Sequence, residues 1–252
     1  MKWLLAFIAV CLVSSTAVVT WALRTQYSDA NAVAGVSYAQ PSTQATVAAS
    51  TTPSPTPAPT ATPAPLPDQV SLTVPYTMQA PFNVWDALHE DACEEASLIM
   101  VKHSIDGTPM GTQEQADKEI TDLVHWEEQH GYGKSITLEQ LNQIAKDYYG
   151  LNNGQVVQTS SIDEVKTELA GGHPVILGMA GKLLPNPYFS NGGPNYHMLV
   201  AKGYDSTGII TDEPGTFHGD GFHYDYSAFY AAIHNWNAQD ITSGQKAYLV
   251  FK

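Results

Sequence analysis

Residues 91–104 read DACEEASLIMVKHS, which places Cys93 at the start of an amphipathic segment. Apolar residues recur there at helical spacing, so we expect a helix over residues 93–104. Asp91 is a good N-cap residue, and the two glutamates after the cysteine suit a first helical turn. A helix N-terminus lowers the pKa of a thiol, although two adjacent carboxylates partly oppose that effect. A reactive thiol at this position therefore requires a cationic partner, and imidazole is the usual one.

His197 is the strongest candidate for that partner. It lies in residues 195–200, NYHMLV, where a Gly/Pro-rich loop leads into an apolar strand. A histidine at the end of a loop that a core strand holds in place can face a cleft. The alternative is a strand-end histidine that only binds water.

Two adjacent acids, Asp212 and Glu213, are the candidates for orienting the imidazole. They follow a short strand over residues 208–211 and precede a Pro-Gly pair. If that strand forms a hairpin with the strand that begins at His197, a carboxylate at its end returns close to the ring, as a nucleophile, base and orienting acid require. Adjacent strand residues face opposite ways, so only one of the two acids can reach the ring. The alternative is that both acids serve a turn.

Gln79 precedes Cys93 by fourteen residues. A side-chain amide near the thiol could donate a hydrogen bond to a developing oxyanion, together with the backbone N–H of Cys93. Spacing alone favours the other interpretation, an exposed polar residue.

The rest of the C-terminal part mixes helices and strands. Capping-box patterns, Thr-x-x-Gln, open two of the helices, at Thr112 and Thr137. We expect helices over 93–104, 112–130, 137–149, 161–170 and 226–236, and strands over 70–74, 174–179, 197–204, 208–211 and 247–251. Helices come first and strands later, which predicts an α+β fold with an antiparallel sheet.

Two N-terminal segments precede this domain. Residues 1–24 include WLLAFIAVCLVSSTAVVTWAL, which is long enough to span a bilayer and long for a signal peptide. We expect a membrane anchor or, less favoured, a cleaved signal segment, and hence an extracytoplasmic protein that is membrane-anchored or secreted. Residues 25–68 include TTPSPTPAPTATPAPLP, a Pro/Thr/Ala-rich sequence typical of a disordered linker. The folded domain is expected over residues 69–252.

The amino-acid composition leaves the domain with one cysteine and argues against several kinds of binding partner. The other cysteine, Cys11, lies in the apolar N-terminal stretch, so Cys93 is the domain's single thiol. A lone thiol outside the cytosol is reactive or intermolecular, unless it is simply buried and inert. A formal net charge of −14 argues against nucleic acid and against a polybasic lipid-binding patch. The nine histidines show no spacing typical of a zinc site, so we expect no metal.

Taken in order, these motifs resemble the papain-like double-glycine leader (bacteriocin-processing) peptidase family, in particular its stand-alone bacterial members. The resemblance covers residues 70–236. It rests on VPY before Gln79, on Cys-x-x-Ala-Ser from Cys93, on Tyr-His before an apolar strand, and on TDEPGT at 211–216.

This resemblance implies a papain-like cysteine peptidase fold, with the nucleophile helix packed on an antiparallel sheet, thiol hydrolysis of amide bonds, and no cofactor. By motif, Gln79 matches the oxyanion-hole residue, Cys93 the nucleophile and His197 the base. Glu213 matches the acid by position, and Asp212 matches it by side-chain length. Where transporter-linked members of the family carry Gly-Pro after the nucleophile, this chain has Glu94-Glu95.

We therefore predict an extracytoplasmic cysteine peptidase that acts on a peptide or protein substrate as a monomer and meets the membrane through its N-terminal segment. One alternative is a cell-wall amidase or acyl transferase on a similar fold. The other is a non-catalytic papain-like binding module, which Glu94-Glu95 and the shifted acid would suit.

Overall fold

The computed structural model describes residues 65–252. The predicted membrane anchor or signal segment, residues 1–24, and nearly all of the predicted linker, residues 25–68, lie outside the described residues. Within residues 65–252, none of the helices combines the length and the apolar character that crossing a membrane requires.

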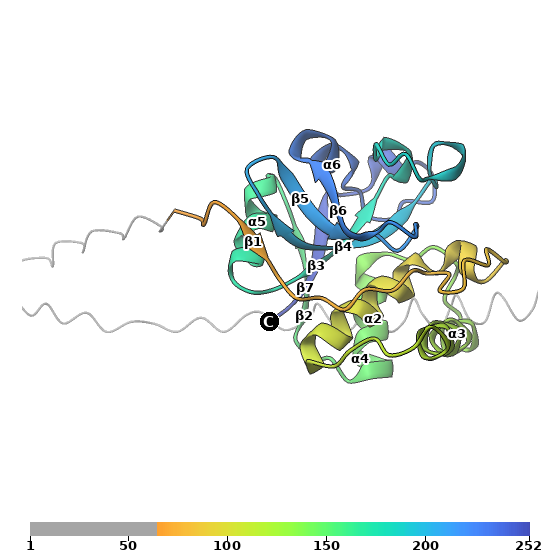
Figure 1. Ribbon diagram of the computed structural model, residues 1–252. Coiled ribbons are helices and arrows are strands. Elements are labelled where there is room, and N and C mark those ends of the chain that lie inside the picture. Colours follow the sequence, from red (N-terminus) through yellow and green to blue (C-terminus); the bar gives the residue numbers. More distant parts are fainter. Residues whose placement is uncertain (1–64) are drawn as a thin grey trace, which may run out of the picture. The chain divides into compact units, whose positions relative to one another are not determined.

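An antiparallel sheet of seven strands forms the centre of the described domain (Figure 1). The strands are β1 (Val70–Ser71), β2 (Gly154–Gln158), β3 (Val175–Met179), β4 (His197–Tyr204), β5 (Gly208–Asp212), β6 (Asp220–Asp225) and β7 (Ala247–Phe251). Their order is β2-β7-β3-β4-β5-β6, and β1 pairs with β4. The predicted β4–β5 hairpin is confirmed, with Val200 opposite Asp212. This register returns the acidic end of β5 toward the start of β4.

Helices pack on both faces of this sheet and create two cores. The helices are α2 (Cys93–Asp106), α3 (Gln113–Gln129), α4 (Leu138–Tyr149), α5 (Ile162–Ala170) and α6 (Tyr226–Ala232). The first three share one core with Met198 and Val200 of β4, whereas α5 and α6 share the other with Leu199 and Ala201. Figure 1 shows α2 running along the sheet beside β4. The alternation of side chains along a strand explains the division, and the predicted α+β fold is confirmed.

The start of α2 is set by packing rather than by a side-chain cap. The N-cap is Ala92, which makes no cap hydrogen bond, so the expectation that Asp91 caps this helix is wrong. Asp91 instead ends a short 3-10 helix, η1 (His89–Asp91), and pairs with Lys134 at 2.6 Å. Residues 93–101 are buried throughout, so contacts with the sheet and α3 hold the helix. The capping boxes expected for α3 and α4 are both present.

Four elements differ from the sequence-based expectation. β2 and β6 are not among the predicted strands, and both lie at edges of the sheet. β1 ends at Ser71, well before the expected position. α6 ends at Ala232, because Ile233 leaves the helix to form a bridge with Met179 of β3.

Candidate active site

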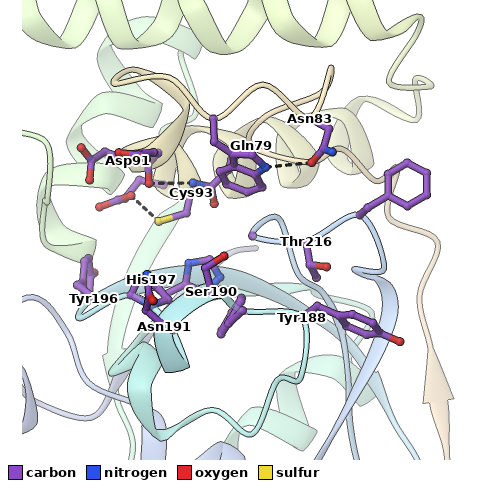
Figure 2. Close-up of a pocket in the computed structure, with 18 of the residues that line it drawn as sticks. Gln79, Asn83, Asp91, Cys93, Tyr188, Ser190, Asn191, Tyr196, His197 and Thr216 are labelled. Atoms are coloured by element: carbon purple, nitrogen blue, oxygen red, sulfur yellow. Dashed lines mark hydrogen bonds between the residues drawn. The ribbon is translucent and has the colours of Figure 1, made fainter.

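The thiol of Cys93 is buried at the first residue of α2. It donates a hydrogen bond to Oε2 of Glu94 at 2.8 Å, and its Sγ accepts one from the backbone N–H of Met198 at 3.3 Å. Figure 2 shows the sulfur directed from the helix toward the side of the cavity that holds His197. The hydrogen bonds of this thiol and of the imidazole do not join the two groups to each other. The thiol therefore faces the base but is bonded to the neighbouring carboxyl.

The surroundings of Cys93 favour the neutral thiol. Burial raises the pKa of the Cys93 thiol well above its ordinary value, and the charge and hydrogen bond of Glu94 raise it further. The backbone N–H of Met198 opposes this shift in pKa. A thiolate forms here only if the proton moves to a base within the same cavity.

His197 begins β4, and its imidazole is buried. Nε2 bonds to Oε1 of Glu213, which leaves Nδ1 as the ring nitrogen that can exchange a proton on the opposite side. The ring of Phe189 meets the imidazole edge to face, with 5.4 Å between centroids. The carboxylate and this aromatic contact fix the orientation of the base.

Of the two adjacent acids, Glu213 is the one that contacts the imidazole. Its carboxylate also accepts hydrogen bonds from the backbone N–H two residues later, at 2.9 Å, and from the hydroxyl of Tyr224, at 3.0 Å. Asp212 points the other way and pairs with Nζ of Lys202 at 2.5 Å. The two acids are both fully buried, so each is held by its own set of donors.

Gln79 lies in the cavity, but its amide is engaged elsewhere. Nε2 donates to the backbone carbonyls of His89 at 2.8 Å and of Glu90 at 3.2 Å, while Oε1 is buried without a partner. These bonds tie Gln79 to η1, the turn that leads into the nucleophile helix. The structure thus brings Gln79 near Cys93 and shows a positioning contact that spacing did not predict.

A cavity of about 600 Å³ lies where the start of α2 meets the start of β4. Cys93, Gln79 and His197 line it, and Glu213 lies behind the imidazole. In Figure 2, Gln79 and Cys93 lie on the helical side, whereas His197 and Tyr188 lie on the sheet side. In the described part of the chain, no group of three or more His, Cys, Asp or Glu side chains is arranged to hold a metal ion.

Three buried glutamates form a cluster beside the start of α2: Glu94, which contacts the thiol, Glu95 on the same helix, and Glu127 on α3. Burial raises their pKa values to about 8, 7 and 10, respectively, and repulsion from neighbouring carboxylates adds to all three pKa shifts, with Asp91 acting on Glu95. Each has one carboxyl oxygen without a hydrogen-bond partner. The sequence reasoning missed Glu127, although it lies on the same buried stripe of α3 as Ala116 and Leu123, and that spacing was the available signal.

Replacing Glu127 by glutamine is expected to flatten the dependence of stability on pH. Between its unfolded and folded pKa values this carboxyl is ionised in the unfolded chain and protonated in the folded one, so the free energy of unfolding falls as pH rises. For Glu127 the window runs from 4.5 to about 10. One such group contributes a slope of about 1.4 kcal/mol per pH unit, and Glu127→Gln should remove it.

Denaturant titrations of the two proteins across the range from about pH 5 to about pH 9 measure this slope. Glu128→Gln is the matched control, because Glu128 is the exposed neighbour on the same helix. The same slope in wild type and Glu127→Gln would show that the buried carboxyl does not hold its proton in the folded protein.

Comparison with known proteins identifies the family. The Peptidase_C39 like family matches residues 71–243, more than half of the chain. No curated protein matches. Among solved structures, the chain is similar to a candidate C39-like peptidase of Bacillus anthracis, with 17% identity and a TM-score of 0.48 over 74% of this chain and 98% of that one.

A second similar structure is xylellain, a cysteine protease from Xylella fastidiosa, with 18% identity and a TM-score of 0.34 over 75% of this chain and 87% of that one. The family match agrees with the resemblance found in the motifs around Cys93 and His197. The chain therefore belongs to the Peptidase_C39-like family of cysteine-type peptidases.

Proposed function

We propose that this domain hydrolyses peptide bonds with Cys93 as the nucleophile, His197 as the base and Glu213 as the acid that orients the imidazole. One observation carries the proposal: a buried imidazole, held through Nε2 by a buried carboxylate, lines the same cavity as the only thiol of the domain. Nucleophile, base and orienting acid are the three parts that thiol catalysis needs.

In the proposed reaction, the thiol proton of Cys93 passes to Nδ1 of His197 as Sγ attacks the carbonyl carbon of the scissile bond. The carbonyl electrons move onto oxygen and form a tetrahedral intermediate. Its collapse breaks the C–N bond, and the imidazolium gives its proton to the leaving amine. Water, deprotonated by the same ring, then hydrolyses the thioester and regenerates the thiol. The carboxylate of Glu213 balances the imidazolium charge in both steps.

The oxyanion of this intermediate needs hydrogen-bond donors. The backbone N–H of Cys93, at the N-terminus of α2, supplies one. Gln79 supplies the second if its amide releases the longer of its two bonds, the one of 3.2 Å to the carbonyl of Glu90. Hydrogen bonds of this kind often reach their catalytic geometry only in the substrate complex.

Replacing Gln79 by alanine is expected to lower kcat by about 10²-fold, the typical effect of removing one oxyanion donor. KM should change little, because the bond forms only as charge develops on the oxygen. Steady-state kinetics on one peptide measure both constants. A larger change in KM than in kcat would assign Gln79 to substrate binding instead.

We also propose that the domain acts outside the cytoplasm as a monomer, with residues 1–24 anchoring it or directing its export. The apolar run and the Pro/Thr/Ala-rich stretch after it support the location outside the cytoplasm. Added protease should digest the domain in intact cells that express the full chain. Protection of the domain until the cells are lysed would contradict the proposal.

One observation favours a second candidate, a non-catalytic binding module: burial raises the pKa of the Cys93 thiol, and the thiol is bonded to Glu94. A digest of unfolded proteins incubated with the full chain and read by mass spectrometry separates the candidates. New peptide termini that appear with time support the peptidase. Their absence, with retained binding of peptides, supports the binding module, and turnover of purified cell wall alone would support an amidase.

A further inference from the structure

Exposed aromatic side chains gather around the cavity of Cys93, and the reaction itself makes no use of them. In residues 65–252, seven large hydrophobic side chains are exposed, and three of them line this cavity: Trp85, Tyr188 and Phe217. Phe82 belongs to the same loop as Trp85 and is also exposed. Exposed apolar groups that concentrate at one cleft are typical of a binding surface.

These rings are held in place before any ligand binds. On the sheet side, Tyr188 stacks on His218 with 4.1 Å between ring centroids, and Phe217 meets His218 edge to face at 5.8 Å. On the helical side, the indole N–H of Trp85 donates to Oδ1 of Asn83 at 2.9 Å. Asn83 has a positive φ of 56°, which shapes this loop. Rings fixed in this way lose little conformational freedom when a ligand covers them.

We propose that this aromatic part of the cavity is a subsite for a bulky apolar side chain, aromatic or large aliphatic, of the peptide substrate. The inference rests on the proposed peptidase function and names the substrate class for that site. The rings and the thiol share one cavity, and an extended chain advances about 3.3 Å per residue. The recognised side chain therefore lies within a few residues of the scissile bond.

Cleavage-site profiling on a peptide library, followed by kinetics, tests the subsite in the full chain. Cleaved bonds should be enriched in Phe, Tyr, Trp, Leu or Met at one fixed position. For a matched pair of peptides with Phe or Ala at that position, Trp85→Ala and Phe217→Ala should each lower the ratio of kcat/KM values by about tenfold. Ile105→Ala is the control, because Ile105 is about as exposed as Trp85 but lies outside the cavity.

Cleavage without enrichment at any position, or an equal ratio in Trp85→Ala and Ile105→Ala, would overturn the subsite and leave the peptidase function intact. A complete lack of cleavage by the wild type would contradict the proposed function itself.

A different observation concerns Glu94, which the reaction also leaves unused. Its Oε2 accepts the thiol hydrogen bond of Cys93, and its Oε1 is buried without a partner. The side chain is buried and lines the cavity. A carboxyl group that has no cation beside it is stable at such a position as the neutral acid.

The surrounding charges reinforce this preference for the neutral acid. The titratable groups around Glu94 are Cys93 and Glu95 on α2, Glu90 and Asp91 on η1, Glu127 on α3, Lys134 in the next loop, and Tyr196 and His197 at the start of β4. The two cationic or potentially cationic groups are already engaged: Lys134 pairs with Asp91, and His197 with Glu213.

We propose that Glu94 is a positioning residue for the nucleophile: as a carboxylic acid it donates a hydrogen bond to the Cys93 thiolate, and as a carboxylate it disfavours that thiolate. In the acid form, the thiolate has two donors, Glu94 and the backbone N–H of Met198. The thiol proton goes to His197, while Glu94 keeps its own proton through the turnover. Activity should therefore fall when Glu94 ionises, near pH 8.

The pH dependence of kcat/KM in the wild type, Glu94→Gln and Glu95→Gln tests this inference. Glutamine has the shape of the neutral acid and stays a donor at every pH. The ratio of kcat/KM at about pH 9 to kcat/KM at about pH 6 should therefore be about tenfold higher in Glu94→Gln than in the wild type. Glu95 raises the pKa of Glu94 by repulsion. Glu95→Gln should therefore have the opposite effect from Glu94→Gln: the loss of activity at high pH should begin at a lower pH than in the wild type.

An unchanged ratio in Glu94→Gln, or shifts in the same direction in both variants, would overturn the role of Glu94. The rate at which iodoacetamide alkylates Cys93, measured over the same pH range, allows the same comparison of the variants without substrate turnover. A wild type that hydrolyses no peptide thus contradicts the proposed function, while the alkylation profiles still decide the role of Glu94.

Discussion

His197→Ala is expected to lower kcat/KM for peptide hydrolysis by about 10⁴-fold, at the upper end of what one general acid–base group contributes. The buried thiol loses the group that takes its proton, and the leaving amine loses the group that returns it. The remaining activity comes from substrate binding and the oxyanion donors. Progress curves on a fluorogenic peptide, with the full chain at high concentration, cover the necessary range.

His218→Ala is a matched control for this loss. His218 also lines the cavity, but it stacks on Tyr188 instead of pairing with a buried carboxylate. Its replacement should affect KM for bulky substrates more than kcat. Equal losses of kcat in the two variants would mean that pairing with Glu213 does not identify which histidine acts as the base.

Glu213→Gln is expected to lower kcat by about 10³-fold with little loss of stability, because the amide keeps the volume of the acid but not its charge. The imidazolium that forms when Cys93 loses its proton is then left without a counter-charge in a buried site. The hydroxyl of Tyr224 can still bond to the replaced side chain, at the position where it now donates at 3.0 Å. Steady-state kinetics and denaturant unfolding separate the two effects.

Asp212→Asn is the control for the neighbouring acid. Asp212 pairs with Lys202, which also contacts Asp220 at 2.7 Å. We therefore expect a loss of stability and nearly normal kcat for Asp212→Asn. A fall in kcat comparable to that of Glu213→Gln would show that the orienting role is not confined to the acid that touches the ring.

The parts of the fold that the sequence predicts well carry strong local signals. Thr112 and Thr137 open helices with capping boxes whose partners are three residues away. The β4–β5 hairpin has a short connection between two apolar runs. By contrast, β2 and β6 are edge strands, and in β6 only Tyr224 is fully buried. Edge strands bury little apolar surface, so the alternation of apolar and polar residues along them is weak. They form because they pair with strands that are distant in the sequence.

The sequence motifs predict which residues lie at the candidate site, but they do not predict the contacts between those residues. Motifs identified Gln79, Cys93, His197 and the two acids, and the structure brings them to one end of the sheet. The choice of Glu213 over Asp212 as the neighbour of the ring depends on the strand register, which the sequence left open. The bond between Cys93 and Glu94 was equally hidden, because a charged residue in a first helical turn is usually solvated.

The most direct test of the central claim is the rate of iodoacetamide alkylation of Cys93 in the wild type and in His197→Ala, measured near neutral pH with Cys93→Ala as the blank. If the imidazole takes the thiol proton, the wild type should be alkylated rapidly. His197→Ala should then be alkylated only as slowly as a buried neutral thiol. Equal rates in the two proteins would show that the sulfur and the imidazole do not share a proton, and the peptidase mechanism proposed for this domain would not stand.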